Sequence, residues 1–106
     1  MSDAWQLFKT TELLNNKSDS DVSFQEFLKT ESMHCGLYHL KAGSTDMQTP
    51  HDEDEMYYVI SGQAKLKVSG STQDVTPGTL LYIRASEEHA FFEIEEDMTL
   101  LVIFAS

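Results

Sequence analysis

Two residues whose side chains commonly bind metal ions lie close together in the middle of this chain. His51 and Glu55 stand in the run from residue 48 to residue 62, which reads Q-T-P-H-D-E-D-E-M-Y-Y-V-I-S-G. The aromatic and β-branched residues after Glu55 predict a strand, which the serine-glycine turn at the end of the run would terminate. Because side chains alternate between the two faces of a strand, Glu55 shares a face with Tyr57. A carboxylate buried on that face needs a partner, and a metal ion or a histidine would be suitable.

The spacing around this run resembles the first motif of the cupin superfamily, G-x5-H-x-H-x3,4-E-x6-G. Its five fixed places fall on Gly43, Thr49, His51, Glu55 and Gly62, with threonine in place of the first histidine. The resemblance covers roughly residues 37 to 104. It is most similar to small single-domain cupins that carry a D-x-Q-x-P-H-x-x-D-E run, here residues 46 to 55.

The second cupin motif, G-x5-P-x-G-x2-H-x3-N, matches the chain less well. It can be laid on Gly78, Arg84, Ser86, His89 and Glu93. Gly78 and His89 agree with the motif, whereas the other three replace its proline, glycine and asparagine. His89 is therefore the residue that this motif adds to the candidate site.

Carried over residue by residue, the resemblance implies a metal site made of His51, Glu55 and His89. Two histidines and one carboxylate are the ligand set of the facial triad that holds non-haem Fe(II) with open positions for substrate or dioxygen. Imidazole and carboxylate ligands also suit other divalent metals, so Fe, Mn, Ni and Zn all stay open. Gln48 is a possible fourth ligand through its amide oxygen, although strand parity places Thr49 beside His51.

The same alternation predicts the surroundings of the site. Tyr57 and Phe91 should point inward with the candidate ligands, which gives an aromatic, apolar cavity suited to a small organic molecule. Tyr57 is a candidate catalytic residue that hydrogen-bonds substrate or acts as an acid, and a core residue is the alternative. Arg84 either meets an anionic substrate group at the mouth or forms a rim salt bridge with Glu87 or Glu88.

The resemblance implies an all-β fold, an antiparallel double-stranded β-helix or jelly-roll barrel, and the residue pattern agrees with it. Short period-two segments separated by turns succeed one another from Met33 to the end of the chain. The last two are Ala90 to Ile94 and Met98 to Phe104, which the acidic residues 95–97 should separate. Before them, Ser23 and Glu26 have the form of a capping box, which predicts one short helix that ends near Thr30. We expect a single domain, with an amino-terminal arm and helix over 1–32 and the barrel over 33–106.

Two further histidines lie in the first strand of the predicted barrel. His34 and His39 stand outside the ligand spacing, so we interpret them as hydrogen-bonded or partly exposed strand histidines. The arm in front of the helix contains Trp5, Leu7 and Phe8. Such a short apolar segment needs a surface to lie on, and a partner's sheet would provide one, which favours a homodimer.

Composition excludes several classes of function. The chain of 106 residues has 18 acidic and 7 basic residues and a formal charge of −11, which argues against nucleic acids and anionic membranes as partners. With a lone cysteine, no basic-then-apolar leader and no long apolar run, we expect a cytoplasmic protein.

Two classes of function remain after these exclusions. The first is a metal-dependent enzyme, an oxygenase (dioxygenase-like) or an isomerase or lyase, that acts on a small organic molecule. The second is a non-catalytic cupin that binds a small ligand or a metal as a sensor or storage module, which the loss of one histidine favours. A metal-free cupin resembling the RmlC-like sugar epimerases ranks last, because the few basic residues are scattered.

Overall fold

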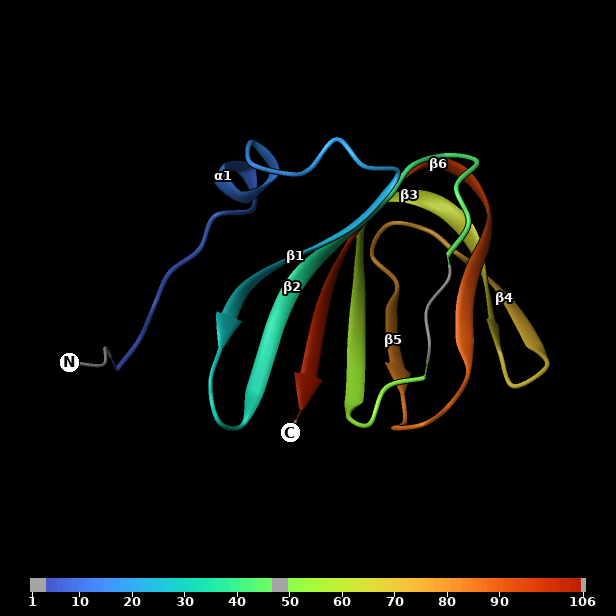
Figure 1. Ribbon diagram of the computed structural model, residues 1–106. Helices are drawn as coiled ribbons and strands as arrows, with labels where there is room; N and C mark the ends of the chain where they lie inside the picture. Colours follow the sequence, from blue (N-terminus) through green and yellow to red (C-terminus); the bar gives the residue numbers. More distant parts are fainter. Residues whose placement is uncertain (1–3, 47–49, 106) are drawn as a thin grey trace.

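The computed structural model describes residues 4–46 and 50–105, and six antiparallel strands dominate this part of the chain (Figure 1). The elements are α1 (Thr10–Leu14), β1 (Val22–Lys29), β2 (Met33–Leu40), β3 (Asp54–Val68), β4 (Ser71–Val75), β5 (Leu80–Ile83) and β6 (His89–Ala105). The strand order is β1-β2-β6-β3-β4, and β5 pairs with β3. The predicted all-β, antiparallel fold is confirmed. Within the described ranges, α1 is far too short to cross a membrane.

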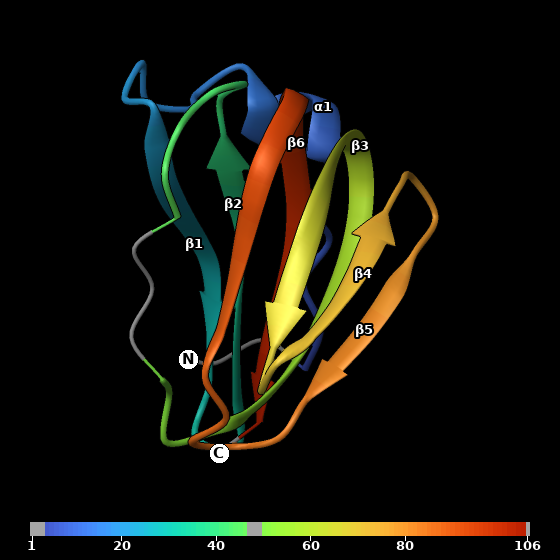
Figure 2. The same ribbon diagram turned by 90° about the vertical axis from the view of Figure 1, so that its right-hand side faces the viewer.

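The two longest strands, β3 and β6, connect the two layers of the fold. They pair along their length, from Asp54 opposite Ala105 to Val68 opposite His89, with register shifts around Gly62. Figure 2 shows the result: β1, β2, β5 and one half each of β3 and β6 form the rear layer, and the other halves with β4 form the front. The core lies between these layers.

The course of β3 and β6 corrects two boundaries expected from sequence. Gly62 does not end the strand, because β3 continues through it to Val68 with a φ of +93° at the glycine. Likewise the acidic run at residues 95–97 lies inside β6, which is unbroken from His89 to Ala105. A positive-φ glycine and shifted pairing bend a strand without reversing it while its partner bends alongside.

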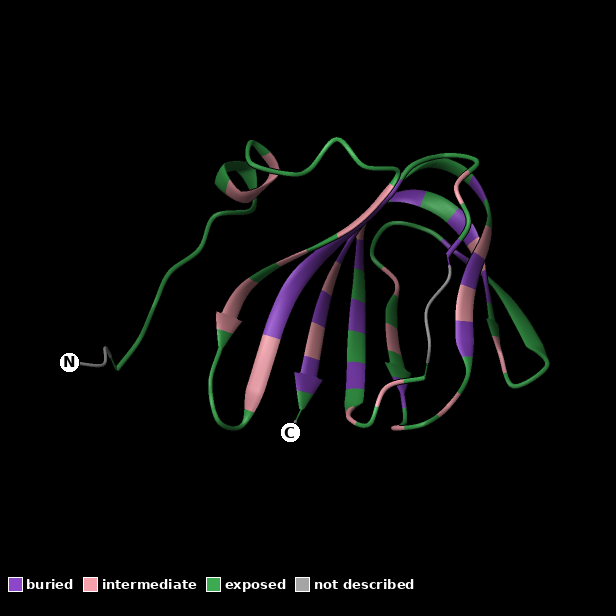
Figure 3. Ribbon diagram, viewed as in Figure 1, coloured by how far each residue is buried: buried purple, intermediate pink, exposed green. Residues whose placement is uncertain are grey.

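The inward face of β3 is the one predicted. Glu55, Tyr57 and Val59 are buried, whereas Met56 and Tyr58 between them are exposed. Figure 3 shows this alternation as purple and green bands along β3. The inward side chains join those of β2, β5 and β6 in one hydrophobic core. Burial of each large apolar side chain contributes about 1.5–3 kcal/mol, which is why this register is strongly preferred.

The predicted helix over residues 23–30 is wrong, since this segment is strand β1. It pairs antiparallel with β2, placing Phe24 opposite Tyr38 and Gln25 opposite Leu37, with a bulge between Glu26 and Leu28. The capping-box pattern reflects a local preference for helix. The free energy of this preference is much smaller than the free energy gained from a full ladder of backbone hydrogen bonds and a buried apolar face. The short helix found in the described ranges is instead α1, earlier in the chain.

The segment that contains α1 lies against the outer side of β1. The Gln25 side-chain amide donates a hydrogen bond of 2.8 Å to the carbonyl oxygen of Leu13. The rings of Phe8 and Phe27 lie 4.8 Å apart, centroid to centroid. These contacts hold α1 against the face of β1 that points away from the core.

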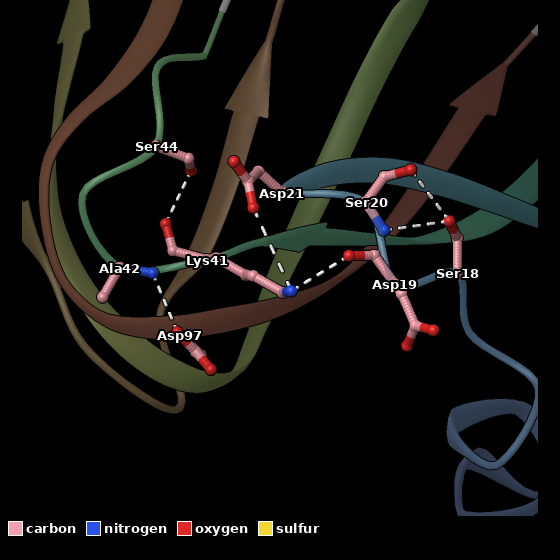
Figure 4. A network of polar contacts seen from close by, with 8 residues as sticks. All are labelled: Ser18, Asp19, Ser20, Asp21, Lys41, Ala42, Ser44 and Asp97. Atoms are coloured by element: carbon pink, nitrogen blue, oxygen red, sulfur yellow. Dashed lines mark hydrogen bonds and ion pairs between the residues drawn. The ribbon is translucent and has the colours of Figure 1, made fainter.

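Polar contacts fasten the end of this segment to the turn after β2 (Figure 4). The Lys41 ammonium donates to the carbonyl oxygen of Asp19 at 2.9 Å and lies 4.0 Å from the Asp21 carboxylate. The Ala42 backbone N–H donates to the Asp97 carboxylate at 2.8 Å. The exposed ion pair contributes little by itself, so the hydrogen bonds to backbone groups define the position of this turn.

His39 is predicted to make the stability of the protein depend on pH. Its ring lies 3.3 Å from the Gln25 side-chain oxygen and 3.4 Å from the Thr99 hydroxyl. Burial, and then the charge of Lys17, lower its pKa from 6.5. Since the folded state disfavours the protonated ring, this group's contribution to stability is complete above pH 6.5 and falls as the pH drops.

Urea unfolding of wild type and His39→Gln between about pH 5 and pH 7.5 measures this dependence. The difference in unfolding free energy between the two proteins should move in favour of the variant as the pH falls. A difference that stays constant with pH would show that His39 does not titrate in this range.

Candidate metal centre

Three residues from separate parts of the chain meet at one end of the core. Glu55 lies near the start of β3, His89 is the first residue of β6, and His51 lies in the loop before β3. Their metal-binding atoms all lie within 4.8 Å of one another. The backbone N–H of Ser86 donates to the carbonyl oxygen of His51 at 2.6 Å, which joins the loop of His51 to the turn before β6.

Glu55 and His89 form a buried pair. The Nε2 atom of His89 lies 2.9 Å from Oε1 of Glu55, and each side chain is only 1% exposed. The other ring nitrogen, Nδ1, lies 2.9 Å from the carbonyl oxygen of Glu87, which can only accept, so Nδ1 carries a proton. This bond orients the ring and directs Nε2 into the cluster, as the outer hydrogen-bond partners of metal-bound histidines do.

The protonation of His89 is set by these contacts. Burial acts to lower the pKa of His89, but the hydrogen bonds to Glu55 and to the Glu87 carbonyl outweigh it, and the pKa is raised. The ring therefore favours a charged form that donates from both nitrogens. A metal ion at Nε2 would take the place of that proton.

The Glu55 carboxylate provides the test of whether a metal fits here. Its second oxygen, Oε2, is buried and has no hydrogen-bond partner within residues 4–46 and 50–105. A buried polar atom left without a partner costs about 1–3 kcal/mol, and more when it carries charge. A divalent cation held by this oxygen and the two imidazoles would satisfy it, so the residues present fit a metal ion.

Tyr57 belongs both to the core and to the neighbourhood of the cluster. It is 1% exposed, and its ring packs edge-on against Phe91 at 5.3 Å. Its hydroxyl lies 3.1 Å from Nε2 of His89. The predicted inward positions of Tyr57 and Phe91 are confirmed, and the Tyr57 hydroxyl is within hydrogen-bond reach of a candidate ligand.

A pocket of about 310 Å³ adjoins the cluster. Its wall is largely aromatic and is made by Phe24, His34, Tyr38, His51, Glu53, Tyr57, Val102 and Phe104. The ring of His51 meets that of Phe104 edge-on at 4.9 Å. Because His51 and Tyr57 belong to both the wall and the cluster or its neighbourhood, a small molecule in this pocket would lie beside the candidate ligands.

His34 lies in the wall of this pocket, a position that the sequence did not indicate. Its Nε2 atom lies 2.8 Å from the Glu53 carboxylate, and its ring stacks on Phe104 at 4.6 Å. The prediction of a hydrogen-bonded strand histidine is confirmed for both His34 and His39. The place of His34 in the pocket had no signal in sequence, because strand pairing alone brings β2 beside the loop that carries Glu53.

A second residue missed in sequence is Asp46, which is buried beneath the site. One carboxylate oxygen accepts from the Tyr38 hydroxyl at 2.6 Å, and the other accepts from the Phe91 backbone N–H at 2.8 Å. Burial, and then the hydrogen bond to Asp46, raise the pKa of Tyr38. Asp46 begins the D-x-Q-x-P-H run, and its contacts anchor that run to β2 and β6.

The remaining sequence-predicted residues lie at the rim or outside the described part of the chain. Arg84 forms the expected rim salt bridge with Glu87, at 3.1 Å. Gln48, the possible fourth ligand, and Thr49, which replaces the first histidine of the motif, both fall in residues 47–49, outside the described residues.

A cupin domain model matches residues 36–104 of this chain. The chain belongs to the cupin family. An uncharacterized protein of Streptomyces coelicolor is 40% identical over 98 residues, which are 92% of this chain and 93% of that relative. This cupin and its Streptomyces relative are thus similar over nearly their whole lengths.

Solved structures share the fold at lower identity. The DMSP lyase DddQ of Ruegeria pomeroyi superposes with a TM-score of 0.76 at 16% identity, over 81% of this chain but 47% of the lyase. This cupin therefore spans about half the length of that enzyme. KdgF of a Halomonas species has a TM-score of 0.74 at 15% identity, over 84% of this chain and 83% of KdgF. The TT1209 protein of Thermus thermophilus has a TM-score of 0.75 at 24% identity, over 92% and 95%.

Proposed function

We propose that this cupin binds one divalent metal ion through His51, Glu55 and His89 and uses it as an enzyme on a small organic molecule. The observation that carries the proposal is the buried Glu55 carboxylate, whose Oε2 lacks a partner among the described residues. A fold rarely keeps such an oxygen without a reason, because no contact offsets the cost of its desolvation. Fe, Mn, Ni and Zn are all compatible with two imidazoles and one carboxylate.

Metal bound at this site would supply Lewis-acid or redox chemistry, which suits an oxygenase or, as the variant reaction, an isomerase or lyase. The lyase among the structural relatives supports the variant reaction by analogy of fold alone. The protein's own contribution is the pocket, where aromatic and apolar side chains exclude water and select a compact substrate. The Tyr57 hydroxyl, 3.1 Å from His89, is the group proposed to orient or protonate substrate.

The second candidate is a non-catalytic cupin that holds a small ligand or a metal as a sensor or storage module. Threonine at position 49, where the family motif has its first histidine, favours this function because the protein ligand set is reduced. The two candidates differ in the fate of the bound organic molecule: the enzyme converts it to a product, whereas the module binds and releases it unchanged.

Elemental analysis of tag-free protein purified without chelator tests the metal site. Wild type should carry close to one Fe, Mn, Ni or Zn per chain, or reach it on addition of metal. His51→Ala should lose most of this metal because one of the three ligands is gone. Asp52→Asn, an exposed neighbour outside the cluster, is the control and should retain it. Full metal content in the His51 variant would contradict the proposed ligand set.

The partners and location are proposed on the grounds of charge and composition. We propose a cytoplasmic homodimer that binds a small molecule and neither nucleic acid nor membranes, because its charge of −11 opposes polyanions. Gel filtration at low and physiological salt with and without DNA would detect an association with nucleic acid that contradicts this.

A further inference from the structure

The outer face of the rear layer is apolar and exposed to solvent over three neighbouring strands, β6, β3 and β5. Met56 pairs with Ile103 on one side and Tyr82 on the other, and Tyr58 pairs with Leu101 and Leu80. Side chains in register on neighbouring strands share a face. We call these six residues the outer patch: Met56, Tyr58, Leu80, Tyr82, Leu101 and Ile103.

The neighbouring part of this face, over β2, is buried, whereas the outer patch is exposed. Over β2, Leu37 and Cys35 are on the same face, opposite Leu101 and Ile103, yet they are only 0% and 4% exposed. The segment that contains α1 lies beside β1, the neighbour of β2 (Figure 1), and contacts it through Gln25 and Phe27. By contrast, Leu80 and Tyr82 are 66% and 62% exposed. The part of this apolar face over β2 is therefore buried, and the part that forms the outer patch is exposed.

The described part of the amino-terminal arm, residues 4–9, is the second unpaired apolar surface. Trp5 and Leu7 are 75% and 68% exposed, although Phe8 packs on Phe27. Figure 2 shows α1 behind the rear layer, which is the side that the outer patch faces. The arm and the outer patch thus lie on the same side of the molecule.

Charge indicates which surface of this chain can meet a second copy. Each copy carries a formal charge of −11, so two copies repel wherever carboxylates come together. None of the six residues of the outer patch is charged, and neither are Trp5 and Leu7. Contact through these surfaces keeps carboxylates at the rim, where water screens them.

The exposed area agrees with what a dimer requires. Six large side chains, four in the outer patch and two in the arm, are 41% to 75% exposed. If a fully exposed large side chain presents about 200 Å², they leave roughly 700 Å² per chain. A standard specific interface takes about 800 Å² from each partner, and a monomer rarely exposes an apolar patch larger than a few hundred Å².

We infer that the outer patch is the interface with a second copy of this chain, and that the arm of each copy packs on the outer patch of the other. The contact is self-complementary, as a twofold dimer demands, because each chain supplies one patch and one arm. This deepens the homodimer proposed above by naming its surface. It is independent of the metal proposal, because the candidate ligands point to the opposite face of β3.

Analytical ultracentrifugation of wild type and three variants tests the inference. Wild type should sediment at twice the 12.0 kDa chain mass. Leu80→Glu places a charge on the most exposed residue of the outer patch and should raise the dimer dissociation constant about 30-fold or more. Thr72→Glu adds the same charge at an exposed position on β4 and should leave the constant within about threefold. The double variant of Trp5→Ala and Leu7→Ala should raise it about tenfold or more.

Each outcome decides a part of the inference. Three results would contradict the outer patch as the dimer interface. They are a monomeric wild type, equal effects of Leu80→Glu and Thr72→Glu, and an unchanged dimer in Leu80→Glu. An unchanged dimer in the arm variant would overturn the role of the arm. Circular dichroism checks that each variant is folded, and metal content measured on the same samples separates a failed interface from a failed metal site.

Discussion

Replacement of Glu55 by glutamine is expected to weaken metal binding about 100-fold or more while leaving the metal-free protein nearly as stable as wild type. The carboxylate is the anionic member of the candidate ligand set, and its loss removes both a ligand and the charge that offsets the metal. The glutamine has the same shape and its amide can donate to Nε2 of a neutral His89. A neutral pair in place of a buried ion pair changes stability little, by about 1 kcal/mol or less.

Isothermal titration with Zn(II) or Mn(II), together with urea unfolding of the chelator-treated proteins, measures both quantities. Glu53→Gln is the matched control: it makes the same chemical change two residues earlier, in the loop before β3, but its carboxylate pairs with His34 and lies outside the cluster. Glu53→Gln should keep its metal affinity. If both variants bound metal as wild type does, Glu55 would be a core acid only; if Glu55→Gln unfolded the metal-free protein, the pair with His89 would be structural.

Replacement of Gly62 by alanine is expected to destabilise the fold by about 2–5 kcal/mol. Gly62 lies at the bend of β3 with a φ of +93°. A Cβ atom there would lie 2.5 Å from the carbonyl oxygen of Asp97 and 2.6 Å from Cα of Met98. Left-handed backbone strain costs about 1–2 kcal/mol for a residue with a Cβ, and overpacking against the backbone of β6 adds about 1–3 kcal/mol.

The same substitution at Gly70 separates the two causes. Gly70 has a φ of +88° in the turn between β3 and β4, and a Cβ there meets nothing within 4 Å. Gly70→Ala should therefore show the strain alone, about 1–2 kcal/mol. Thermal and urea unfolding of the two variants gives the comparison. Equal losses would mean that β6 moves aside at Gly62 and that the bend is softer than the contact distances indicate.

Several features could be predicted from sequence because they depend on local pattern and spacing. Alternation after His51 placed Glu55 and Tyr57 on the inward face of β3, and the burial of both agrees. The motif spacing selected His89, which the structure brings to Glu55. A period of two is set by the backbone itself, so such patterns hold in any antiparallel sheet with one buried face.

Other features were decided by contacts between distant segments. Residues 23–30 have a helical pattern but pair with β2, because a ladder of hydrogen bonds and a buried face outweigh local preference. Gly62 bends β3 and does not end it, because β6 runs alongside through the bend. The residues of a strand do not by themselves determine which strand it pairs with.

For the site, the residue types and their spacing were determined by the sequence, and their surroundings by the tertiary structure. His51 and Glu55 are neighbours in the chain, so their proximity was expected. The roles of His34, on the pocket wall, and Asp46, beneath it, arise when β2 and β6 pair and bring the loop before β3 over them. Whether a carboxylate oxygen finds a partner depends on all the chain around it, and only the folded molecule shows that Oε2 of Glu55 has none among residues 4–46 and 50–105.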